Sequence, residues 1–160
     1  MGSLVTWFDG QFARLYAGWC KLIENVEPAD LYRTLAGSQA ASVGECVVRS
    51  AGVVEQTFGG ITANFWDDPF EWTLPETLTS HERLLEYFGE VEATRRRGLE
   101  FFTGDEDLLK TIMTPSDETQ PASLLLDTLV RARLYNLQAT EMSKQLARNR
   151  QPAQIAANRT

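Results

Sequence analysis

The sequence is poor in the residues that usually hold transition metals. Its 160 residues include one histidine, His81, and two cysteines, Cys20 and Cys46. The cysteines form no Cys-x-x-Cys pair and do not cluster with the histidine, so their spacing excludes a structural zinc site. Both lie in helical patterns, which indicates two reduced and largely buried thiols.

Long apolar runs and an excess of basic charge are also missing. No stretch approaches the roughly 20 uninterrupted apolar residues that span a bilayer, so we expect no membrane partner. Met1-Gly2-Ser3 is not followed by a basic region and an apolar run, so we expect no signal peptide and a cytoplasmic location. The net charge is −7, from 15 Lys and Arg against 22 Asp and Glu. An acidic chain repels phosphate backbones, which argues against a nucleic-acid partner.

Helical periodicity dominates what remains. With 43% hydrophobic residues, the chain has enough apolar surface for one core and one domain. No segment has a credible strand pattern, whereas the 4-3 spacing of an amphipathic helix occurs four times. The four apolar stripes comprise Phe8, Phe12, Leu15, Trp19, Leu22 and Val26; Val43, Val47, Val54, Phe58, Ile61 and Phe65; Leu84, Phe88, Val91 and Phe102; and Leu125, Leu126, Leu129, Val130, Leu134 and Leu137.

Capping and helix-breaking residues set the expected boundaries. Pro28 ends the first segment, and Ser42 with Glu45 forms a capping-box pattern at the start of the second. Gly104 is expected to end the third segment as a left-handed C′ residue. Short extra helical turns are expected near 29–35 and 105–113. The fourth segment runs from about 122 to 147, so we expect one helical domain over 1–148 and a fraying polar tail over 149–160.

The link between the second and third segments, residues 66–78, is too apolar to be a flexible spacer. Trp66, Phe70, Trp72 and Leu74 indicate an ordered loop packed across one end of the helices. Gly59-Gly60 just before it indicates a bend or a close contact in the second helix. Four long helices with longer second and third links predict an all-α four-helix bundle.

Three short motifs, in order and spacing, resemble a known superfamily. Ser42-Val43-Gly44-Glu45 at a helix start, Asp67-Asp68-Pro69-Phe70, and Leu84-Leu85-Glu86-Tyr87 before the arginine-bearing third helix resemble DinB-like proteins, which include YfiT-like members. The resemblance covers roughly residues 4 to 148. It implies an up-down-down-up four-helix bundle from a bacterial-type stress family that contains thiol-dependent transferases and isomerases, with members that often form homodimers.

The resemblance also implies where a metal site would lie. The superfamily holds a metal with three histidines, one on the second helix and a His-x-x-x-His pair on the fourth. Those positions fall here on Arg49, Arg131 and Tyr135. The resemblance therefore implies a metal-free protein that needs no cofactor and has lost its catalytic ligands. An atypical divalent metal site built from Glu, Asp and His81 remains an alternative.

The residues that replace the metal ligands form the candidate binding site. Arg131, Tyr135, Gln138 and Met142 share one face of the fourth helix, and Arg49 is expected to face them from the second. Glu55 is a possible counter-ion on the second helix. This set is either a structural polar seam or a pocket for a small anionic ligand, because guanidinium groups bind carboxylate and phosphate bidentately.

Three functions remain open from the sequence. The favoured one is a non-catalytic DinB-like protein that binds a small ligand or a protein partner through the candidate site. The alternatives are a thiol-dependent transferase or isomerase with an atypical site, and a structural protein that acts as a dimer. His81 and the charged residues of the third helix are interpreted as a solvated surface, comprising Glu82, Glu86, Glu90, Glu92, Arg95, Arg96 and Arg97.

Overall fold

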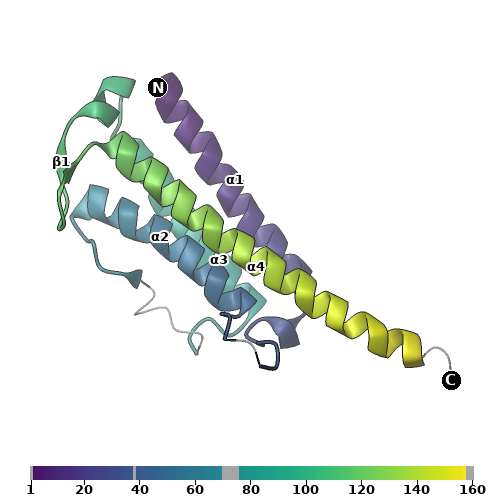
Figure 1. The fold of residues 1–160 in the computed structure, drawn as a ribbon. Helices are drawn as coiled ribbons and strands as arrows, with labels where there is room; N and C mark the ends of the chain where they lie inside the picture. The colour runs from purple at the N-terminus through teal and green to yellow at the C-terminus, as the bar shows by residue number, and fades with distance from the viewer. Residues whose placement is uncertain (1, 38, 70–75, 158–160) are drawn as a thin grey trace.

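The computed structural model describes residues 2–37, 39–69 and 76–157, with side chains to residue 150. Most of the chain lies in four long helices, which confirms the all-α prediction (Figure 1). They are α1 (Ser3–Asn25), α2 (Val43–Ala63), α3 (His81–Leu99) and α4 (Pro121–Ala157). The links contain the 3-10 helices η1 (Pro28–Asp30) and η3 (Asp105–Leu109), and the antiparallel two-residue strands β1 (Ile112–Met113) and β2 (Glu118–Thr119). None of the described helices is long and apolar enough to cross a membrane.

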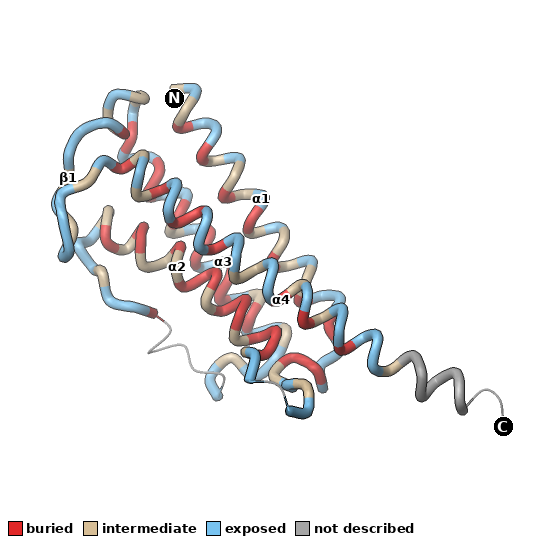
Figure 2. The backbone as a smooth tube through the Cα atoms, in the orientation of Figure 1, coloured by how far each residue is buried: buried red, intermediate tan, exposed pale blue. Residues whose placement is uncertain are grey.

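The four helices pack in a ring in which α1 and α2 are diagonal. Helix α2 packs against α3 and α4, and α1 packs against the same two helices. The Cys46 thiol lies 3.9 Å from Gln138 Oε1, and the Thr57 and Thr128 hydroxyls lie 2.6 Å apart, so α2 and α4 run in opposite directions. The interior between the helices is filled by large apolar side chains. Figure 2 colours the buried positions along the backbone red.

The start and end of α2 follow from local chemistry. Ser42 Oγ accepts from the Glu45 backbone N–H at 3.3 Å, which confirms the predicted cap. The close contact expected at Gly59-Gly60 is made by Trp66, whose indole packs so tightly on Gly60 that any Cβ there would clash with the ring. Residues 70–75 of the expected apolar loop, which include Phe70, Trp72 and Leu74, lie outside the described residues.

Two predicted helix ends differ from the structure. Helix α3 ends at Leu99, and Gly104 has an extended φ of −150° before η3 rather than a left-handed C′ conformation. Beyond α3, η3 caps the start of α1. Asp105 Oδ1 accepts from the backbone N–H groups of Leu4 and Val5, at 3.0 and 3.2 Å. Helix α4, in turn, continues past residue 147 to Ala157.

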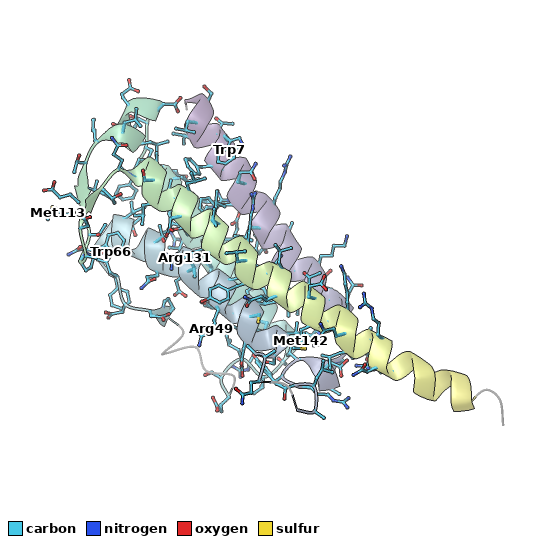
Figure 3. All side chains as sticks on the ribbon, viewed as in Figure 1. Trp7, Arg49, Trp66, Met113, Arg131 and Met142 are labelled. Carbon is cyan, nitrogen blue, oxygen red and sulfur yellow. The ribbon has the colours of Figure 1, made fainter. Side chains whose placement is uncertain are left out.

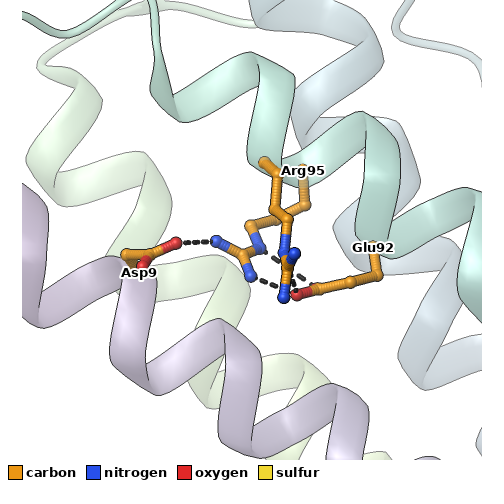
Figure 4. Close-up of polar contacts among 4 residues, drawn as sticks. Asp9, Glu92 and Arg95 are labelled. Carbon is orange, nitrogen blue, oxygen red and sulfur yellow. Dashed lines mark hydrogen bonds and ion pairs between the residues drawn. The ribbon is translucent and has the colours of Figure 1, made fainter.

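The charged face predicted for α3 is partly buried, so that interpretation was wrong for Glu92 and Arg95. Arg95 is only 1% exposed. Figure 4 shows its guanidinium between Asp9 of α1 and Glu92, with which it forms ion pairs. Glu92 also accepts from the exposed Arg96 at 3.2 Å. This network joins α1 to α3 at a position where an unpaired charge would be strongly unfavourable.

The apolar stripe predicted for α4 is only half buried. Leu125 and Leu129 belong to the core as expected. The four other apolar residues of the stripe face outward and are 50–60% exposed: Leu126, Val130, Leu134 and Leu137. The packed helices cover only the side of α4 that carries Leu125, Leu129 and Ala132, so the adjoining side stays open to solvent.

Candidate functional site

Arg131 lies on the exposed side of α4, at the edge of a cavity of about 530 Å³. This cavity opens between α2, the β1–β2 hairpin and α4, and Gln56, Thr57 and Trp66 also line it. The Arg131 Nε donates to Asp127 Oδ2 at 2.9 Å, one turn earlier on the same helix. The guanidinium is therefore already paired within α4.

Carboxylates outnumber the one guanidinium in this cavity. Asp117, Glu118 and Asp127 line it together with Arg131. The local charge is therefore negative, which opposes the binding of an anion. The electrostatics do not favour the small anionic ligand that the sequence suggested for Arg131.

The other candidate residues of α2 and α4 lie at different levels from Arg131 along the bundle. Arg49 is half-buried on α2, and Figure 3 shows it at a different level from Arg131. Tyr135 is half-buried on α4, and the exposed Gln138 lines a second cavity of about 360 Å³ with Cys46 and Met142.

Glu55 faces α3 rather than the α2–α4 side. Its carboxylate accepts a hydrogen bond from the Tyr87 hydroxyl at 2.6 Å, and it lines a third cavity. The structure thus distributes Arg131, Gln138 and Glu55 among three cavities instead of bringing them into one pocket.

The two thiols lie in surroundings that suppress their reactivity. Burial is the main cause that raises the pKa of both cysteines, Cys20 and Cys46. For Cys46, Glu45 raises the pKa further while Arg49 lowers it. A thiol with a raised pKa carries little thiolate at neutral pH, and thiolate is the nucleophilic form. This chemistry does not favour thiol catalysis.

His81 is not the solvated residue that its sequence position suggested. It is half-buried, and its Nε2 lies 2.6 Å from the backbone oxygen of Val26. Because a carbonyl oxygen only accepts, the Nε2 must carry the proton and donate it. His81 therefore fixes the start of α3 to the end of α1. In the described part of the chain, no group of three or more His, Cys, Asp or Glu side chains is placed to hold a metal ion.

The most prominent surface feature is apolar, and the sequence interpretation missed it. The exposed α4 stripe meets Trp7 of α1 at its first residue, Leu126, and Trp7 is 45% exposed. A cavity of about 510 Å³ at this end is lined by Leu4, Trp7, Phe8, Ala122, Ser123 and Leu126. We call this surface the α1–α4 face and define it by five residues: Trp7, Leu126, Val130, Leu134 and Leu137.

One sequence signal does point to the α1–α4 face. Apolar residues occur in adjacent pairs on α4, as Leu125-Leu126 and Leu129-Val130. Adjacent residues on a helix point about 100° apart, so such pairs widen the apolar arc beyond one packing stripe. The second stripe is the part that the chain's own helices leave uncovered.

Comparison of the chain with family models, curated proteins and solved structures gave no significant match.

Proposed function

We propose that this chain is a divergent, metal-free DinB-like protein without catalytic activity that acts by pairing with a second copy through the α1–α4 face. The observation that carries the proposal is the stripe of four large apolar side chains, each at least half exposed, on α4. Monomeric proteins rarely leave contiguous apolar patches of this kind in water, and large patches mark interaction sites.

The helix directions support the DinB-like part of the proposal. Helices α1 and α3 run in opposite directions, since His81 joins the end of α1 and Asp105, beyond α3, caps its start. Helices α2 and α4 also run in opposite directions. With α1 and α4 parallel in Figure 1, these directions support the up-down-down-up order that the resemblance implies.

The spacing of the stripe favours a second copy as the partner. Its steps of four, four and three residues are almost symmetric about residue 132. An antiparallel copy of α4 therefore places Val130 against Leu134, and Leu126 against Leu137, in both directions. Two-fold pairing of one patch with itself is the commonest arrangement in protein oligomers.

The loss of catalysis is supported by the residues at the metal positions. Arg49, Arg131 and Tyr135 stand where the superfamily has histidines, and cationic arginines repel a metal ion. Both cysteines are free and at least half-buried, which supports the cytoplasmic location that we include in the proposal.

A pair of charge substitutions tests the proposal. Leu134→Glu places a carboxylate in the centre of the α1–α4 face, whereas Leu109→Glu changes a leucine of similar exposure on η3. We expect the wild type and Leu109→Glu to be dimers by light scattering at micromolar concentration, and Leu134→Glu to be a monomer of unchanged helical content. Dissociation of both variants, or of neither, would show that the α1–α4 face does not hold the dimer.

A further inference from the structure

A cavity of about 400 Å³ lies between α2, the segment after it and α3, away from the α1–α4 face. Its volume lies in the range of small-molecule sites, roughly 300–1,000 Å³. Phe65 and Pro69 supply much of its apolar wall. The described lining residues are Glu55, Gln56, Gly59, Phe65, Asp67, Pro69 and Thr94.

The polar lining of this cavity is acidic. Glu55 is half-buried and holds the Tyr87 hydroxyl at 2.6 Å, and Asp67 adds a second carboxylate at the exposed rim. The Gln56 amide is engaged, because its Nε2 donates to the backbone oxygen of Trp66 at 2.8 Å. Arg97 donates to the Thr94 hydroxyl at 3.3 Å, so its charge lies beside the Thr94 wall.

Among the described residues, the groups that act on the Glu55 carboxylate are a hydroxyl and another carboxylate. Burial raises the pKa of Glu55, the Tyr87 hydrogen bond lowers it, and the nearby Glu90 raises it again. None of the described basic side chains contributes to this shift. A carboxylate in an apolar pocket with acidic neighbours gains more from a bound cation than an exposed carboxylate does, because water screens the attraction less.

We propose that this cavity binds a small organic cation, an ammonium group on an apolar body. The ammonium donates to the Glu55 carboxylate, and the apolar body packs against Phe65 and Pro69. Binding holds Glu55 in its ionised form while Tyr87 keeps its hydrogen bond to the same carboxylate. The site does not depend on the pairing of two copies, because its residues belong to α2, α3 and the segment between them.

Benzylammonium is a suitable probe, and benzyl alcohol is its neutral counterpart of nearly equal shape. We expect calorimetric or NMR titration at neutral pH to show benzylammonium binding with a Kd below about 10 mM. Benzyl alcohol should bind at least about tenfold more weakly, because it lacks the positive charge that the Glu55 carboxylate attracts.

Two variants test whether the ammonium group binds at Glu55. Glu55→Gln should weaken benzylammonium binding by about tenfold or more and leave benzyl alcohol binding unchanged. Glu90→Gln, which removes a nearby carboxylate that does not line the cavity, should change the affinity by about twofold or less. Equal losses in the two variants would show a diffuse charge effect and overturn the assignment to Glu55.

The pH dependence of binding to the wild-type protein gives a second test, and this test does not depend on whether a variant folds. Affinity for benzylammonium should fall as the pH is lowered through the raised pKa of Glu55, because the protonated carboxyl loses its charge. The groups facing Glu55 are Tyr87 and Glu90 of α3 and Asp67 at the rim. Undetectable binding, equal binding of the alcohol, or an affinity independent of pH would each overturn the proposal.

Discussion

The indole Nε1 of Trp19 donates to the hydroxyl of Ser50 at 2.8 Å in the centre of the protein. The same hydroxyl donates to the backbone oxygen of Ala132 at 2.6 Å. Two hydrogen bonds thus connect α1, α2 and α4 through one side chain that is fully buried. They satisfy the polar indole N–H where water does not reach it and fix the register of the three helices.

Substitution of Ser50 by alanine should therefore destabilise the fold. The indole N–H of Trp19 would lose its acceptor inside the core, which costs about 1–3 kcal/mol. Ser123→Ala, at an exposed position, should change stability by less than about 0.5 kcal/mol. Urea denaturation of the two variants measures both effects, and equal stability of Ser50→Ala and wild type would refute the structural role of this link.

Loss of the Arg95 ion pairs should lower the stability of the fold more than loss of the Ser50 hydrogen bonds. Arg95→Met leaves Glu92 buried with only the exposed Arg96 as a partner, and loss of one member of a buried ion pair costs about 3 kcal/mol or more. Arg97→Met removes a neighbouring arginine from the exposed surface and serves as the control. Thermal or urea unfolding should show a large loss for the first variant and little change for the second.

The Glu55–Tyr87 pair predicts a pH dependence of stability. The pKa of Glu55 is raised above its ordinary value of 4.5 in the folded protein. Its favourable contribution is therefore fully present below that value and is lost as the pH rises through the folded pKa. Compared with Glu55→Gln, the wild type should lose stability over this pH window. Parallel stability curves of the two proteins from acidic to neutral pH would contradict the raised pKa.

The environment of the two thiols predicts slow alkylation. Both pKa values are raised by burial, and Cys46 is the more deeply buried of the two. Iodoacetamide at neutral pH should modify Cys20 before Cys46, and both more slowly than a model peptide thiol. Mass spectrometry of timed samples measures the rates. Faster reaction of either cysteine than the peptide would instead favour the thiol-dependent alternative.

Helix positions were the most accessible feature from the sequence, because each helix carries its own periodic and capping signals. The Ser42 cap and the core residues Leu125 and Leu129 lie where those signals predict. The role of η3 was not predictable in this way. Its Asp105 caps a helix about 100 residues earlier, and a local pattern does not contain that partner.

The sequence contains a signal for the burial of Arg95, but the charge of the residue favoured an exposed position. It follows Leu84, Phe88 and Val91 in the same 4-3-4 register, which places it on the buried side of α3. The candidate site was harder to derive. Asp127, the partner of Arg131, lies four residues earlier on the same helix, where a local pattern can find it. Tyr87, the partner of Glu55, depends on how α3 packs against α2.

Sedimentation equilibrium of the wild-type protein measures whether two copies of the chain pair, as the proposed contact at the α1–α4 face requires. We expect a mass of twice the 18.0 kDa of one chain at micromolar concentration, with dissociation only on dilution. A mass of one chain across the whole micromolar range would contradict it.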